Sequence, residues 1–263
     1  MLWFVLGGVL AMGLLAFLAA PKLHRFAYWI GRRSDAEVAA LATNGWRQDR
    51  LEVEPGIHLT GLVRPAAASD ARWILFVPGN SSGMLPGFRS ELDQLRGNDD
   101  VGLAFWAYRG FEASDGVPGP AALAADLLQQ WAAVRALGVP ADRLEIWGYS
   151  LGTPLATQLA ATLCARGEPP RRLVLAAASA RIPVMRHGLF GRFLPDDVYD
   201  AGPAIAAVTC PVVLVHGTND DALPIGEARA LATAFGPRVQ FHEVPGRGHV
   251  DLWQDLRRLA FAP

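Results

Sequence analysis

The sequence predicts an α/β fold in which a mostly parallel central sheet is covered by helices on both faces. Short, continuous apolar runs such as 173–178 and 211–215 are typical of strands that are buried on both faces. These runs alternate along the chain with longer helical segments, and that alternation indicates parallel strands joined by helices. With 263 residues, of which 51% are hydrophobic, the chain is long enough for one such domain with a full core.

The expected elements begin with a hairpin, whose strands at 46–53 and 57–63 meet at the turn Glu54-Pro55-Gly56. The later expected strands are 73–77, 101–107, 144–147, 173–178, 211–215 and 239–244. The expected helices are 87–95, 120–137, 153–165, 224–235 and 250–260. Ligands of such sheets bind beyond the carboxyl ends of the strands. We therefore expect the chemistry in the loops that follow strands.

Charge and cysteine content exclude several classes of protein. The formal net charge is −1, and no basic block or stripe is present, so nothing indicates nucleic-acid binding. The two cysteines, Cys164 and Cys210, are far apart in the sequence and have no CxxC or Cys/His cluster around them. Neither a disulfide scaffold nor a zinc site is expected, and no metal or organic cofactor is implied.

The pentad Gly-Tyr-Ser-Leu-Gly at 148–152 directly follows the apolar run 144–147. A strand that ends in Gly-x-Ser-x-Gly and continues into a helix forms a sharp turn, which lifts the serine hydroxyl off the edge of the sheet. The glycines are needed because a Cβ there would collide with neighbouring backbone. Ser150 is thus a candidate nucleophile, although the pentad alone could arise by chance in a chain with 27 glycines.

A serine hydroxyl needs a base to take its proton, and the base needs an acid to orient it. Asp220 lies in the loop after the strand 211–215 and is the predicted acid, while Asp221 fits a helix N-terminal acid. Among six histidines, only His249 lies in a loop after the last strand, so it is the predicted base. His216 is expected to brace the acid loop.

Hydrolysis also needs hydrogen-bond donors for the oxyanion that develops on the substrate. The backbone N–H of Leu151 is one candidate, because it lies at the start of the helix after Ser150. The second is expected from the glycine-rich loop 78–83, where Asn80 is the best candidate. A phosphate-binding loop is the alternative interpretation of this segment, but neither Gly-Lys-Ser/Thr nor GxGxxG is present.

Taken in order, these motifs resemble the serine α/β-hydrolase superfamily and, within it, the ABHD12/13/17 and Bem46-like hydrolases. The matching segments are 76–80, 108–111, 114–116, 148–152, 216–220, 223–224 and 248–249, within about residues 46–263. Two residues depart from the family pattern: Pro78 replaces a usual histidine, and Glu112 replaces a small residue. The pair Tyr108-Arg109 is expected to be structural.

The resemblance implies an α/β-hydrolase fold with a short cap at about 180–209. It also implies a serine hydrolase of the carboxylesterase, lipase or thioesterase type. Such an enzyme would cleave ester or thioester bonds of acyl or lipid-like substrates through Ser150, Asp220 and His249 and an acyl-enzyme. An aminopeptidase-like enzyme and a non-catalytic, membrane-anchored binding module remain as alternatives. The cap stretch 182–194 fits either a membrane-surface segment or a short helix over the protein's own core.

The stretch 2–20 contains no charged residue. As a helix it would be about 28 Å long, close to the hydrocarbon thickness of a bilayer. Basic residues on its C-terminal side place the following domain in the cytoplasm by the positive-inside tendency. We therefore expect a single-pass anchor in the inner or cell membrane at 1–21, a linker helix at 22–45 and the hydrolase domain at 46–263. A cleaved signal peptide, with export, and a buried core helix are the alternatives.

Overall fold

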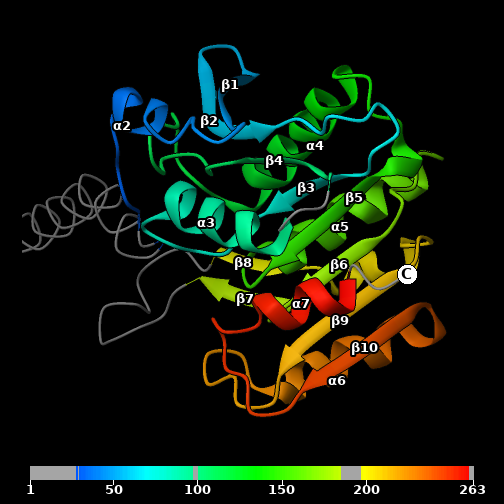
Figure 1. The fold of residues 1–263 in the computed structure, drawn as a ribbon. Coiled ribbons are helices and arrows are strands. Elements are labelled where there is room, and N and C mark those ends of the chain that lie inside the picture. The colour runs from blue at the N-terminus through cyan, green and yellow to red at the C-terminus, as the bar shows by residue number, and fades with distance from the viewer. Residues whose placement is uncertain (1–27, 29, 97–99, 185–196, 261–263) are drawn as a thin grey trace, which may run out of the picture.

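The computed structural model describes residues 28, 30–96, 100–184 and 197–260. Within them, eight strands form one sheet in the order β1-β2-β4-β3-β5-β6-β9-β10 (Figure 1). The strands are β1 (Arg47–Glu54), β2 (Ile57–Arg64), β3 (Trp73–Val77), β4 (Gly102–Trp106), β5 (Leu144–Tyr149), β6 (Leu173–Ala176), β9 (Val212–Gly217) and β10 (Val239–Val244). The pairs β1–β2 and β2–β4 are antiparallel, and all other neighbours are parallel. The predicted, mostly parallel sheet is confirmed.

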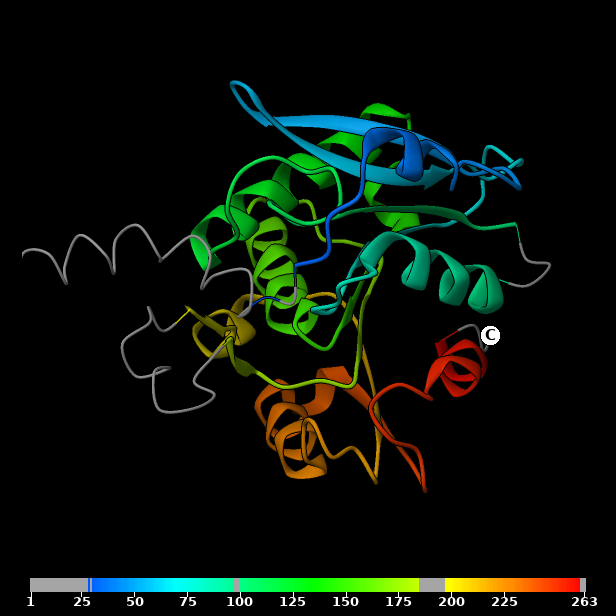
Figure 2. The same cartoon turned by 90° about the vertical axis from the view of Figure 1, so that its left-hand side faces the viewer.

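Helices cover both faces of this sheet, as predicted. One face carries α3 (Met84–Arg96) and α7 (Trp253–Ala260), and the other carries α4 (Pro120–Ala136), α5 (Gly152–Ala165) and α6 (Ile225–Phe235) (Figure 2). Each of these five helices overlaps a predicted one. The strands follow the apolar runs because a strand covered on both faces needs apolar side chains on both.

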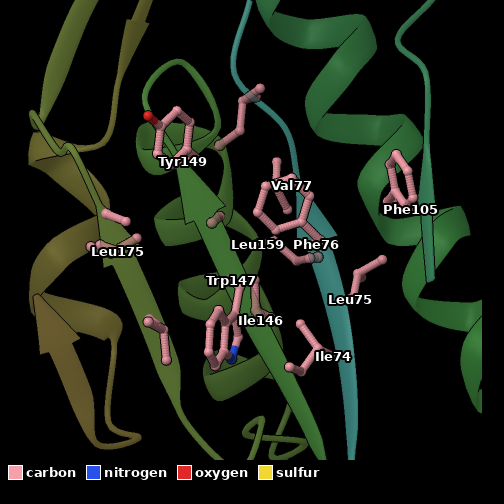
Figure 3. Close-up of a cluster of buried hydrophobic side chains, with 14 of the residues drawn as sticks. Ile74, Leu75, Phe76, Val77, Phe105, Ile146, Trp147, Tyr149, Leu159 and Leu175 are labelled. Carbon is pink, nitrogen blue, oxygen red and sulfur yellow. The ribbon is translucent and has the colours of Figure 1, made fainter. Parts of the chain in front are cut away.

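The centre of the core lies between β3 and β5, all of whose residues are buried. Figure 3 shows Phe76 and Val77 of β3 beside Trp147 and Tyr149 of β5, with Leu159 of α5 packed behind them. Burying a side chain of this size contributes about 1.5–3 kcal/mol. The strands that lead into the loop 78–83 and into the turn at Ser150 are therefore held by apolar packing on both faces.

The strand order reverses at β3. From β3 the chain passes to β4 on one side, and β5 then pairs with β3 on the other side. In open parallel sheets a crevice forms at such a switch point, outside the carboxyl ends of the strands. The pentad after β5 and the glycine-rich loop after β3 both lie there.

The prediction of a linker helix at 22–45 is wrong for the described part of this segment. The only helix there is α2 (Asp35–Ala39). Two reciprocal hydrogen bonds cap the start of α2: the Ser34 hydroxyl accepts from the Glu37 amide, and the Glu37 carboxylate accepts from the Ser34 amide. Upstream, the backbone pairs with Glu112 instead, because the Glu112 amide donates to Gly31 and the Arg33 amide donates to Glu112. Tyr28 and Val38 are fully buried in the core.

The cap contains a short antiparallel pair, β7 (Arg181–Val184) and β8 (Asp197–Asp200), followed by a 3-10 helix, Gly202–Ala207. The sequence predicted no strands here. The Tyr28 hydroxyl donates to Asp197 (2.5 Å) and lies 2.8 Å from the Tyr199 hydroxyl, so it fastens this pair to the N-terminal segment. Most of the predicted amphipathic stretch lies outside the described residues.

Within the described residues, no helix combines the length and the apolar composition that a membrane crossing requires. The predicted anchor at 1–21 falls outside that part of the chain. The anchor and the domain boundaries stay predictions.

Candidate active site

The turn after β5 has the geometry that the pentad predicts. Ser150 has a φ of 50°, in the left-handed region that residues with a side chain seldom adopt. A Cβ on Gly148 would lie 2.7 Å from the Ala156 Cβ, and a Cβ on Gly152 would lie 2.0 Å from the Val77 carbonyl oxygen. Only glycine fits at both positions, so β5 and α5 can meet closely enough to present Ser150 at the tip of the turn.

The structure brings Ser150, His249 and Asp220 together from three separate loops. His249 Nε2 lies 3.0 Å from Ser150 Oγ, and His249 Nδ1 lies 2.7 Å from Asp220 Oδ2. A carboxylate can only accept, so Nδ1 carries the proton and Nε2 is free to accept one from the serine hydroxyl. This arrangement can take a proton from Ser150 as the oxygen attacks.

Asp220, rather than its exposed neighbour Asp221, faces His249. The Asp220 side chain is fully buried, and its Oδ1 accepts from the amides of Ala222 (3.0 Å) and Leu223 (2.8 Å). These bonds fix the carboxylate and leave Oδ2 directed at the histidine. Asp220 is therefore held for one partner, whereas Asp221 points to solvent.

His216 braces the acid loop from behind, as predicted. The Ala178 amide donates to its Nδ1 (2.9 Å), so the proton is on Nε2, which lies 2.8 Å from the Leu223 carbonyl and 3.4 Å from Asp220 Oδ2. Burial lowers the pKa of His216 below its usual value. It therefore remains neutral and serves as a fixed donor.

The acid and base loops pack backbone against backbone. A Cβ on Gly217 would lie 2.2 Å from the Arg247 carbonyl oxygen. The same oxygen accepts from the Asn219 amide (2.9 Å), and the Thr218 amide donates to Val244 (3.0 Å). Since β9 and β10 are parallel neighbours, their two following loops meet at this edge, which sets the distance from Asp220 to His249.

Tyr149 supports the base from the pentad itself. Its hydroxyl donates to the His249 carbonyl, and its ring stacks on Trp253 with centroids 4.9 Å apart. Burial raises the pKa of this phenol, so it is a donor at all physiological pH values. The residue before the nucleophile thus positions the histidine.

Both predicted oxyanion residues lie at the site: one follows Ser150 in the chain, and the other shares its pocket. Leu151 is buried at the N-terminus of α5, and Asn80 lines the pocket beside Ser150. A Cβ on Gly79 would lie 3.2 Å from the Ser150 Cβ, so glycine lets this loop approach the turn closely. The Tyr108 hydroxyl donates to the Pro78 carbonyl (2.5 Å) and fixes the loop where the family usually has histidine.

Arg109 is structural, as predicted. Its guanidinium forms a two-pronged bond with buried Asp126 (2.7 and 2.8 Å) and a second with Glu54 (2.8 and 3.2 Å). These two pairs tie the loop after β4 to α4 and to the end of β1. Arg109 is not among the residues that line the pocket at Ser150.

Glu112, the other departure from the family pattern, is a buried residue of the loop after β4, and its side chain packs against the first turn of α3. Its carboxylate accepts from the Leu85 amide (3.0 Å) and lies 3.0 Å from Arg33 Nε. The first amides of a helix have no partner within the helix, so this acid satisfies one of them. Burial raises the pKa of Glu112. The residue holds together α3 and the segment before α2.

A pocket of about 520 Å³ opens directly over Ser150 and His249. Its wall includes Phe88 and Glu91 of α3 and Trp253 of α7. No sequence motif indicated these three residues, because they lie on helices that cover the sheet rather than in loops that follow strands. No group of three or more His, Cys, Asp or Glu residues that could hold a metal ion occurs in the described ranges.

Comparison with solved structures places this architecture in a known class. An α/β hydrolase from Vibrio vulnificus matches 91% of this chain and 90% of its own, with a TM-score of 0.72 and 17% identity. The fold is that of the α/β hydrolases. The structure of Est1E from Butyrivibrio proteoclasticus matches 80% of this chain and 94% of its own, with a TM-score of 0.60 and 11% identity. The predicted fold is thereby confirmed.

Sequence comparison confirms the predicted resemblance to ABHD12. The lysophosphatidylserine lipase ABHD12 of Danio rerio is 29% identical over 235 residues, which cover 73% of this chain and 61% of the lipase. The mouse protein of the same name is 27% identical over 197 residues, or 49% of its length. The chain thus spans about half to three fifths of these relatives. No family model matches it.

Proposed function

We propose that this chain is a serine hydrolase that cleaves carboxylic ester or thioester bonds of acyl or lipid-like substrates. The observation that carries the proposal is the unbroken chain of contacts from Asp220 through His249 to Ser150 at the floor of the pocket. The similarity to proteins named as lysophosphatidylserine lipases supports a lipid or ester substrate. The hydrolase fold of the solved relatives is consistent with it.

The proposed reaction begins when Ser150 Oγ attacks the substrate carbonyl carbon and its proton passes to His249 Nε2. Asp220 stabilises the resulting imidazolium, and the amides near Leu151 and Asn80 bind the oxyanion. As the carbonyl re-forms, the bond to the alcohol or thiol breaks and the leaving group takes the proton from His249. Water then attacks the acyl-serine by the same steps, which releases the acid and restores Ser150.

The test is labelling of the purified protein with a fluorophosphonate probe, wild type beside Ser150→Ala. The proposal expects labelling of the wild type alone, and hydrolysis of short p-nitrophenyl esters that falls by about 10⁴-fold or more in the variant. If a folded wild type is not labelled, the serine is not activated and the non-catalytic binding module becomes the better interpretation. Labelling with turnover of amino-acyl amides but not esters would favour a peptidase.

The membrane anchor at 1–21 is a second part of the proposal, and it rests on the sequence alone. An integral anchor keeps the chain in the membrane fraction through high salt and carbonate washes, with the hydrolase domain on the cytoplasmic side. Recovery of a shortened, soluble protein outside the cytoplasm would instead favour a cleaved signal peptide.

A further inference from the structure

The pocket over Ser150 has an aromatic wall made of three rings in mutual contact. The rings of Tyr149 and Trp253 are stacked at 4.9 Å, and Phe88 lies 5.8 Å from the first and 6.1 Å from the second. All three side chains belong to residues that are less than a tenth exposed, yet they line the pocket. The electron-rich faces of such rings attract cations.

Glu91 stands beside this wall, one helical turn after Phe88 on α3. Its negative charge lies close enough to Tyr149 to help raise the pKa of that phenol. Burial also raises the pKa of Glu91 itself, because its carboxylate is partly withdrawn from water. Glu91 is half-buried and is one of the residues that line the pocket.

No cation satisfies Glu91 in the described part of the chain. None of the ion pairs or hydrogen bonds there reaches its carboxylate. Arg89, two residues earlier, bonds to Thr43, and Arg247 in the adjoining depression is paired with Asp255 at 2.8 Å. Of the described residues that line the pocket, Glu91 is the one acid, and none of them is a lysine or an arginine.

We propose that this pocket binds the ammonium end of an acyl ester or thioester, with Glu91 as its ion-pair partner and the aromatic wall of Phe88, Tyr149 and Trp253 on one side of it. An unpaired carboxylate next to stacked aromatic rings has the chemistry that recognises quaternary and substituted ammonium groups. A neutral acyl chain would fill the apolar part of the pocket but would leave Glu91 unpaired and partly desolvated, which is costly. This inference rests on the proposed hydrolase function and narrows its substrate class.

The first test is binding, because it needs no turnover. Choline and its neutral isostere 3,3-dimethyl-1-butanol are titrated by calorimetry into Ser150→Ala and into Ser150→Ala/Glu91→Gln. The proposal expects choline to bind the first variant about 10-fold or more tightly than the alcohol, and that ratio to fall to about 2-fold in the second. Equal affinities in Ser150→Ala would overturn the cation site, and a ratio that survives in the double variant would overturn the role of Glu91.

The second test uses the chain with Ser150 in place. The ratio of kcat/KM for butyrylthiocholine to that for its neutral 3,3-dimethylbutyl thioester should collapse in Glu91→Gln and persist in Glu91→Asp, which keeps the charge. The exposed Glu168→Gln is the matched control and should keep the wild-type ratio. Absent turnover of both thioesters would count against the hydrolase proposal, while the calorimetric ratio would still decide the cation site. Unchanged melting of each variant shows that the fold is intact.

Discussion

Two buried carboxylates lie at opposite ends of the same sheet, and their partners differ. Glu145, at the start of β5, lies 2.9 Å from Arg172 Nε, 3.5 Å from Arg171 Nε and 3.9 Å from Arg72 Nη1. Asp220, beyond the end of β9, is held by two histidines and backbone amides. Arginine stays protonated throughout the physiological range, whereas histidine gains and loses its proton there. The amino end of the sheet therefore holds a permanent ion cluster, and the carboxyl end holds groups that can move a proton.

The largest effect is expected for Asp220→Asn, which tests the role of the carboxylate at the carboxyl end of the sheet. We expect kcat/KM for a p-nitrophenyl ester to fall by about 10⁴-fold, because an amide at this position favours the wrong histidine tautomer. The exposed neighbour provides the control: Asp221→Asn should retain activity within about 2-fold, as surface changes usually do. Similar losses in both variants would show that the loop, not the carboxylate, is what matters.

The next largest effect is expected where the acid and base loops touch. Gly217→Ala places a Cβ against the Arg247 carbonyl. The backbone must shift to make room for it, which should lower the free energy of unfolding by about 1–3 kcal/mol. Chemical denaturation should show this loss, together with reduced turnover per folded molecule as Asp220 and His249 move apart. Gly226→Ala on α6, where a Cβ meets nothing within 4 Å, is the control and should be neutral or slightly stabilising.

At the amino end, Glu145→Gln should affect stability alone. Removing one member of a buried ion pair commonly costs about 3–5 kcal/mol, but the arginines here are partly exposed, so we expect about 2 kcal/mol. The free energy of unfolding measures this loss, and kcat/KM of the folded enzyme should stay within about 2-fold. A large loss of turnover without a loss of stability would contradict the proposal that the amino end of the sheet serves stability and the carboxyl end serves catalysis.

The smallest effect is a dependence of stability on pH through His216. Its pKa is lowered by burial, so between that value and the unfolded value near 6.5 the unfolded chain binds a proton that the folded chain does not. The stabilisation is complete above about pH 6.5 and is lost as pH falls through the folded-state pKa. His216→Asn removes this titration, so the free energy of unfolding of this variant should fall less between pH 7.5 and pH 5.5 than that of the wild type.

The sequence predicted the central strands well because β3, β4 and β6 are continuous apolar runs that are buried throughout. The boundaries of β3 and β10 coincide with the predicted ones, and the other strands differ from them by one to three residues. The helix expected at 22–45 is much shorter in its described part, because Glu112 pairs with backbone at Gly31 and Arg33. A contact eighty residues away leaves no local signal, so propensity alone could not predict it.

The residues of the site also divide into those with a local sequence signal and those that depend on distant contacts. Ser150, Asp220 and His249 each follow a strand in a recognisable motif, so their convergence could be predicted from the sheet. Glu91 and Trp253 could not, since they lie on helices whose contact across the pocket depends on tertiary packing. The cap strands were missed because each is four residues long, and Arg181–Val184 includes a proline.

The left-handed turn at Ser150 has a consequence for how this gene would tolerate random change. In a mutational scan that selects for protein abundance, Ser150→Gly should score at or above the wild type, because glycine relieves about 1 kcal/mol of backbone strain. Gly148 and Gly152 should reject every replacement, alanine included, because a Cβ there meets a neighbouring atom within 2.7 Å. Selection for yield would thus discard the proposed nucleophile and keep the two glycines on either side of it in the pentad.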